Sequence, residues 1–449
     1  MSVVIDQSIS RQPATKQDEP RTVGLATATG IVVANIIGFG IFTSLGFQVA
    51  AIQSGFALLL VWVIGGVLSL CGAVCYGELS AALPRSGGEY HFLSVIYHPA
   101  VGFMAGFVSA TVGFAAPVAL AAMAFGKYLD GIFGTELALV ASFVVVWIVT
   151  AFHLLGVRPG AAFQNLSTCA KIVVIALLIG AGLLIPHKQP VQFVPAAGDA
   201  SVLVGSAFAV ALTYVMYSYS GWNAAAYIAG EIKRPEVNVP RALLLGTGVV
   251  MVLYTALNAV FLLATPMAEL RGQVEVGLIA GKHIFGEEGG RVVGGIICLG
   301  LLSAISSMTW IGPRVTMSMG EDHWLLRFLG RRNSRGIPAN AILGQTVIVT
   351  LLLLTRSFEL VVIYIQFSLL LCSLLTVAGV IVLRRTRPDL PRPSCVWAYP
   401  LPVVVFCVAT LWMMIYLLYS HPAESILGLG TMVLGLIVYR AADRRPLVA

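Results

Sequence analysis

Apolar runs separated by short polar segments extend from about residue 22 to near the end of the chain. A helix that crosses roughly 30 Å of hydrocarbon needs about 20 apolar residues, because each residue adds ~1.5 Å. Twelve runs reach or approach this length, so the pattern predicts an all-α integral membrane protein with twelve transmembrane helices. The predicted spans are residues 22–50, 55–83, 100–129, 136–156, 163–186, 201–230, 240–264, 290–317, 338–355, 359–383, 399–419 and 423–439.

Two of these spans carry an interruption. The first contains Gly38-Phe39-Gly40, and in the sixth the segment from Tyr217 to Asn223 brings serines and Gly221 into an apolar run. Lipid offers no partner to freed backbone groups, so such breaks are tolerated only where they are buried in protein or line a cavity. Matching breaks in two halves are typical of transporters built from inverted repeats, although membrane glycines also serve close helix packing. Exposed amides attract a carboxylate and exposed carbonyls attract an ammonium group, so the pair suits a zwitterion.

Composition and charge support a membrane protein. Of 449 residues, 58% are hydrophobic and 10% are charged, against about 25% charged in soluble domains. Residues 1–21 are polar and lack the apolar core of a signal peptide, so they are predicted to form a soluble tail. With that tail inside the cell, most of the 27 Lys and Arg residues fall in cytoplasmic segments. We therefore expect a multi-pass protein of a bacterial-type inner membrane with both termini cytoplasmic. The net charge of +7 then reflects topology and contact with anionic lipid, and no nucleic acid partner is expected.

Several other classes of protein are disfavoured. None of the seven cysteines lies in a predicted outer loop, so we expect no disulfide-linked partner. The spans contain neither a His-Glu-x-x-His motif nor an interior Asp, so an enzyme is not expected, nor is a metal or a cofactor. A channel or receptor would be expected to lack the paired breaks.

Three longer segments carry a family resemblance: "ATGIVVANIIGFGIF", "LCGAVCYGELSAALPRSGGEYHFL" and "YSYSGWNAAAYIAGEIKRPEVNVPRAL". They resemble the amino acid–polyamine–organocation (APC) superfamily, and Gly221-Trp222-Asn223 favours its L-type amino acid transporter branch. The resemblance implies a LeuT-like fold of five plus five inverted helices, in which the first and sixth are unwound at mid-membrane. It implies a transport core at 22–385 with repeats 22–186 and 201–385, and two appended helices with a cytoplasmic tail at 386–449.

The same resemblance implies a site. The substrate carboxylate would meet amides of Gly38, Phe39 and Gly40, and the amino group would meet carbonyls near Ile36 and from Tyr217 to Tyr219. Tyr217 falls where the family has an aromatic gate, and the small Ser220 stands where some carriers of cationic amino acids have Asp. Phe39 departs from the family pattern, which commonly has Ser or Ala there. The full predicted set of substrate-binding residues is Ile36, Ile37, Gly38, Phe39, Gly40, Ile41, Tyr217, Ser218, Tyr219, Ser220, Gly221, Trp222 and Asn223.

Two ionisable residues in the spans are candidates for coupling or gating. Lys171 lies within the fifth span, where an ammonium group either serves function or reaches toward the interface. By resemblance it takes the place of a sodium ion and bridges the first and eighth helices, with Ser303, Ser306 or Ser307 as partners. Glu78 lies near the end of the second span. Its two alternative roles are gating or proton transfer, and packing at the membrane interface.

The sequence thus predicts a sodium-independent amino acid transporter that exchanges or facilitates neutral L-amino acids by alternating access. Proton-coupled symport remains the alternative within transport, because a titrating Lys or Glu is not excluded. A channel or receptor is the alternative of another class.

Overall fold

The computed structural model describes residues 21–443 apart from 86, 157–160, 323 and 335, so most of the predicted tail at 1–21 lies outside the described residues. The described chain is helical, and an isolated bridge between Val23 and Ile232 is the extended pairing found in it. The α-helices are α1 Leu25–Ile36, α2 Ser44–Ala51, α3 Gly55–Ala82, α4 Gly88–Ile96, α5 Pro99–Val108, α6 Phe114–Phe133, α7 Ala138–Leu154, α8 Ala161–Leu183, α9 Asp199–Leu203, α10 Ser206–Ser218, α11 Ala224–Tyr227, α12 Pro235–Ala264, α13 Met267–Leu270, α14 Val276–Asp322, α15 Arg327–Gly330, α16 Ala339–Leu354, α17 Phe358–Thr386, α18 Leu401–Ser420 and α19 Pro422–Asp443. Short helical turns lie at η2 Gly40–Phe42, η3 Ser109–Gly113, η4 Ala229–Glu231 and η5 Trp324–Leu326.

Eight helical segments of the described chain are long and apolar enough to cross a membrane. They coincide with predicted spans two, three, five, seven, eight, ten, eleven and twelve. Four shorter apolar helices, α1, α7, α10 and α16, fall on the remaining predicted spans. The all-helical prediction is confirmed, and the count of twelve crossings stays a prediction.

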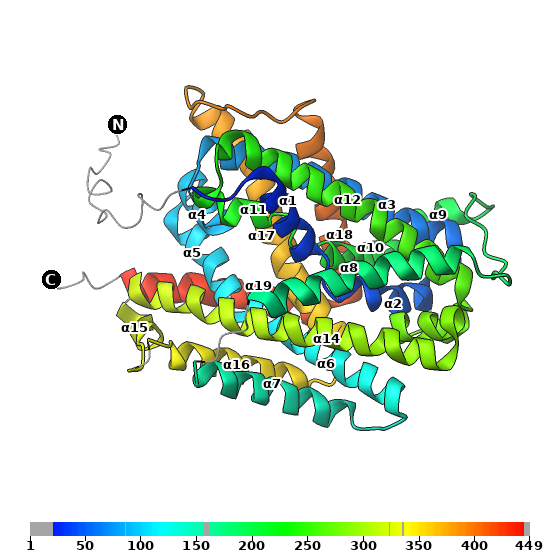
Figure 1. Ribbon diagram of the computed structural model, residues 1–449. Helices are drawn as coiled ribbons and strands as arrows, with labels where there is room; N and C mark the ends of the chain where they lie inside the picture. Colours follow the sequence, from blue (N-terminus) through cyan, green and yellow to red (C-terminus); the bar gives the residue numbers. More distant parts are fainter. Residues whose placement is uncertain (1–20, 86, 157–160, 323, 335, 444–449) are drawn as a thin grey trace.

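The helices form two groups that face each other in Figure 1. In the upper group α3 packs along α12, and α1 and α10 pack against this pair. In the lower group α6 packs against α7, α14 and α16, while α8 contacts both α12 and α14. Helices α4, α11 and α15 lie at one end of the bundle, and α2 and α9 lie at the other.

Three helices depart from the regular runs expected from the sequence. The third span is α5 and α6 joined by a π-helical turn at Ser109–Gly113. The segment between spans seven and eight contains α13 and the first turns of α14. α14 is kinked at Gly286, which has φ 79° and ψ 176° and so separates these first turns from the eighth span.

Candidate functional site at two helix breaks

The first predicted break is present. α1 ends at Ile36, and the chain resumes in the 3-10 turn η2 at Gly40 before α2 begins at Ser44. The amide of Gly38 donates to Ile36 O at 2.6 Å, whereas the amides of Phe39, Gly40 and Ile41 have no protein acceptor among the described residues. Three successive free donors at the start of a helical segment carry a partial positive charge. This segment is therefore suited to an anion such as a carboxylate.

The second break is also present, and it begins slightly later than the sequence suggested. α10 continues through Ser218 and α11 starts at Ala224, so the irregular segment is 219–223. Gly221 has φ +97°, a conformation that side chains rarely adopt. The carbonyls of Ser218 and Ser220 have no donor in the described chain, whereas those of Tyr217 and Tyr219 accept from turn amides. This segment presents oxygen atoms where the first presents amides.

The two breaks contact each other directly. Ser44 Oγ and Ser218 Oγ are hydrogen-bonded at 2.8 Å. A Cβ on Gly40 would lie 2.8 Å from Ser218 Oγ, and a Cβ on Gly221 would lie 2.9 Å from Asn35 O. Both glycines are thus needed for the close approach of the two interrupted helices.

An aromatic cluster covers the α2 side of the breaks. The ring of Phe39 lies 6.0 Å from Tyr217 and 6.4 Å from Phe358. Phe47 stacks on Tyr214 at 5.3 Å and on Phe358 at 5.5 Å. We refer to these five residues, Phe39, Phe47, Tyr214, Tyr217 and Phe358, as the aromatic cluster.

The other side of the breaks is more open. Asn35 is exposed, and Ser220, Gly221 and Asn223 are half-buried, whereas Phe39 and Tyr217 are buried. The breaks are accordingly covered by aromatic rings on the α2 side, while Asn35, Ser220, Gly221 and Asn223 keep exposed surface.

Lys171 and two tyrosines hold the first break in place. Lys171 Nζ donates to Ile37 O at 2.7 Å, Tyr254 Oη donates to Ile36 O at 2.7 Å, and Tyr128 Oη donates to Phe42 O at 2.9 Å. Because Ile36 O accepts from both Gly38 and Tyr254, it is less suited to a substrate ammonium than expected. The carbonyls of Ala34 and Asn35 have no donor in the described chain.

The sequence reasoning missed Tyr128 and Tyr254. Each places a single hydroxyl on a fully buried ring in an apolar helix, α6 and α12 respectively. A buried hydroxyl needs a partner, and that requirement was the available signal.

The predicted partners of Lys171 on α14 lie in other hydrogen bonds. Ser306 Oγ pairs with His153 Nε2 at 3.2 Å, and Ser307 Oγ donates to Ser303 O at 2.9 Å. Lys171 meets α14 through its stem, since a Cβ on Gly300 would lie 3.1 Å from Lys171 Cγ and Cδ. A bridge from Lys171 to these serines stays a prediction.

Glu78 is buried and paired. It is 2% exposed; Arg384 Nε donates to its Oε1 at 2.8 Å, and the amide of Val396 donates to its Oε2 at 2.7 Å. Arg392 Nε lies 3.8 Å from Oε1. The carboxylate thus joins α3, α17 and the segment before α18, and a gating or proton-transfer role for it is untested.

A second buried carboxylate, Glu89 on α4, was not singled out from the sequence. Its Oε1 accepts from Tyr76 Oη at 2.5 Å and from Ser373 Oγ at 3.0 Å. Burial raises the pKa of Glu89, because desolvation penalises the charged form. The ring of Tyr76 lies 4.7 Å from Trp222, so the second break is connected to α4 through these two rings.

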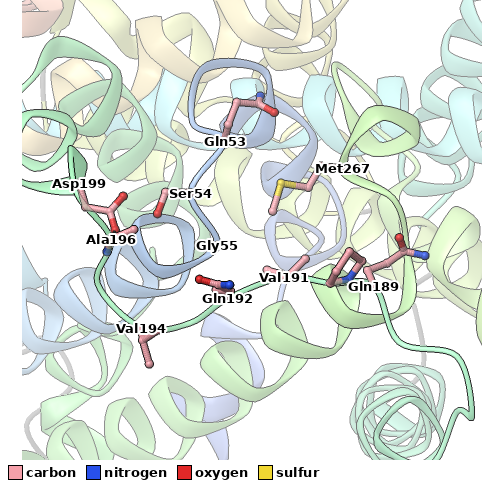
Figure 2. Close-up of a pocket in the computed structure, with 11 residues that line it drawn as sticks. Gln53, Ser54, Gly55, Gln189, Val191, Gln192, Val194, Ala196, Asp199 and Met267 are labelled. Atoms are coloured by element: carbon pink, nitrogen blue, oxygen red, sulfur yellow. The ribbon is translucent and has the colours of Figure 1, made fainter.

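A cavity of about 350 Å³ lies away from the breaks, at the end of the bundle near α2 and α9 (Figure 2). Asp199 there accepts from the amide of Ala196 at 2.7 Å, and this bond together with that from Ser54 lowers the pKa of Asp199. None of the predicted substrate-binding residues lines it.

A bundle of membrane-length helices in which two interrupted helices contact each other defines a multi-pass membrane protein. Residues 23–439 match the family described as amino acid permease, and the chain belongs to that family. Its members are transporters rather than enzymes.

Among curated proteins, the chain is 28% identical over 429 residues to b(0,+)-type amino acid transporter 1 of Mus musculus, covering 93% of this chain and 87% of the relative. It is 28% identical over 432 residues to large neutral amino acids transporter small subunit 2 of Homo sapiens, covering 93% and 80% respectively. These relatives support the predicted resemblance to the L-type branch.

Proposed function

We propose that this protein carries neutral L-amino acids across the membrane without sodium, by exchange or facilitated flux and alternating access. The proposal rests on the contact between a segment with free backbone amides, the first break, and a segment with free backbone carbonyls, the second break. Three free amides of the first break and the free carbonyls of Ser218 and Ser220 lie on segments joined by the Ser44–Ser218 hydrogen bond. An amino acid zwitterion is complementary to both.

We further propose that the first break binds the carboxylate through the amides of Phe39, Gly40 and Ile41. The ammonium group then faces the carbonyls of Ala34, Asn35, Ser218 and Ser220. Tyr217 covers the bound substrate, and Asn223 contributes a polar side chain from the accessible side. Ser220 supplies no carboxylate, so a cationic side chain would be desolvated without a partner.

Lys171 carries the sodium-independent part of the proposal. Its ammonium group already donates to Ile37 O within the first break, where it supplies a fixed positive charge. In a protein interior such a charge acts on the same backbone oxygens that a cation would coordinate. Its stem packs on α14, so it links the first break to the lower helix group.

The proposed architecture follows the same scheme. Twelve crossings form two inverted repeats at 22–186 and 201–385 with two appended helices at 386–449, in a bacterial-type inner membrane with both termini cytoplasmic. The site then opens toward the cytoplasm, because α11 and α4 lie at that end.

The test is uptake by the full-length purified protein in liposomes. Labelled alanine should accumulate equally in sodium and choline buffers, and faster when unlabelled alanine is preloaded. Strict sodium dependence would contradict the assignment of Lys171. Uptake that follows an imposed pH gradient without preloading would favour proton-coupled symport instead.

A further inference from the structure

We propose that Phe39 limits the size of the substrate side chain and restricts this transporter to small neutral amino acids such as glycine, alanine and serine. This inference rests on the proposed function, since it assumes that an amino acid carboxylate binds the amides of the first break.

The position of Phe39 relative to that carboxylate is the first step. Its own amide is one of the three free donors, beside those of Gly40 and Ile41. A carboxylate bound there lies about 2.9 Å from the amide nitrogen, and the Cα of the substrate follows about 1.5 Å beyond the carboxyl carbon. The substrate Cα therefore lies within about 6 Å of the Phe39 amide nitrogen.

The ring of Phe39 is held in place, which is the second step. It is 9% exposed and packs between Tyr217 and Phe358, at 6.0 and 6.4 Å between ring centroids. Phe358 is in turn stacked on Phe47. Moving the ring aside would forfeit at least two aromatic contacts.

The neighbouring space is also filled, which is the third step. Gly40 approaches Ser218 so closely that an added Cβ would lie 2.8 Å from Ser218 Oγ. Ser44 is hydrogen-bonded to the same Ser218 hydroxyl at 2.8 Å. A substrate side chain thus finds Phe39 and Tyr217 on one side and the closed contact of α2 with α10 on the other. Inserting extra methylenes into such a packed region is unfavourable, because neighbouring side chains must leave their preferred rotamers.

The test is inhibition of labelled alanine exchange by unlabelled alanine, leucine and phenylalanine, using the full-length protein in liposomes. In the native protein leucine and phenylalanine should inhibit at least about tenfold more weakly than alanine, a factor equal to ~1.4 kcal/mol. Phe39→Ser should lower this ratio about tenfold. Phe39→Leu, which retains part of the volume, should lie between the two.

Phe47→Ser is the matched control, because it removes a ring from the same aromatic cluster but has no amide in the break. Its size ratio should match that of the native protein, and an equal relaxation there would overturn the specific role of Phe39. Equal inhibition of the native protein by leucine and alanine would overturn it too, as would an unchanged ratio in a Phe39→Ser variant that still exchanges alanine. A native protein that binds no amino acid of the panel would overturn the proposed function itself.

Discussion

The two helix breaks use glycine for different reasons. In the first, neither Gly38 nor Gly40 has a positive φ, and Gly40 is required because Ser218 leaves no room for a Cβ. In the second, Gly221 combines φ +97° with a close approach to the backbone oxygen of Asn35. Gly38 meets nothing nearer than Ile36 O at 3.8 Å. Glycine is thus required for a close approach at Gly40, for a close approach and a positive φ at Gly221, and for neither at Gly38.

The strongest test of this comparison is a rescue experiment. Gly40→Ala and Gly221→Ala should each weaken alanine binding by on the order of 100-fold, or ~2.7 kcal/mol. Ser218→Gly should restore part of the first loss, because it removes the Oγ and Cβ that the new methyl group meets at 2.8 and 3.1 Å, although the Ser218 Cα at 3.0 Å remains. Asn35→Gly should not restore the second, since the obstacles there are a backbone oxygen and a positive φ. Rescue of both, measured by binding in detergent, would show that the breaks are equivalent.

In the proposed mechanism Lys171 links the first break to α14, so its removal should affect movement between the helix groups more than occupancy of the site. Lys171→Met keeps an apolar stem against Gly300 and loses the bond to Ile37 O. We expect exchange to fall by at least about tenfold while alanine affinity changes less than about threefold. Lys127→Met, which lies in α6 outside the described site, is the control. If Lys171→Met exchanged alanine near the native rate, Lys171 would have no part in transport, and the alternative that its side chain only reaches toward the interface would hold.

Charge selection is tested at the second break. Ser220→Asp places a carboxylate among the free carbonyls, where it can pair with a cationic substrate side chain. Arginine should inhibit alanine exchange at least about tenfold more weakly than alanine in the native protein, and Ser220→Asp should narrow that gap by a similar factor. If arginine inhibited the native protein as strongly as alanine does, the proposal that Ser220 makes the site select neutral amino acids would be wrong.

A smaller effect concerns Glu89, which connects to the second break through Tyr76 and Trp222. Its folded-state pKa is raised by burial, so protonation stabilises the fold. That contribution is fully present below the unfolded pKa of about 4.3 and is lost as pH rises through the folded value. Glu89→Gln should therefore flatten the decline of Tm from acidic to neutral pH, as thermal unfolding in detergent would measure. An unchanged pH profile would contradict the assignment.

The smallest effect is expected at Gly38. Gly38→Ala should leave alanine affinity within about threefold, because a Cβ there makes only an ordinary contact with Ile36 O. A large loss would mean that this glycine serves a conformation other than the one described here.

The sequence predicted the existence of both breaks because glycine and serine are conspicuous in apolar runs. It could not distinguish Gly38 from Gly40, since that depends on Ser218, which lies 178 positions after Gly40 in the chain. The apolar runs also predicted the helices, but not the π-helical turn at Ser109–Gly113 or the kink at Gly286. Tyr128 and Tyr254 escaped notice because apolar periodicity does not register one hydroxyl on a large ring.

Glu78 was the least predictable of the candidates. Placed at the end of an apolar run, it was compatible with a solvated carboxylate, and only the return of α17 to the same end brings Arg384 to it. Pairing between residues 306 positions apart leaves no local signature in a single sequence.

That separation also orders the biosynthesis of the protein. At 5–20 residues per second, Arg384 leaves the ribosome about 15–60 s after Glu78. Throughout that interval the carboxylate at the end of α3 has neither Arg384 nor the Val396 amide, so this end of the helix stays in contact with water or headgroups. The packing of α3 against α17 is therefore complete only after α17 has been synthesised. A nascent chain cut before Arg384 would therefore leave an unpaired carboxylate at the end of α3.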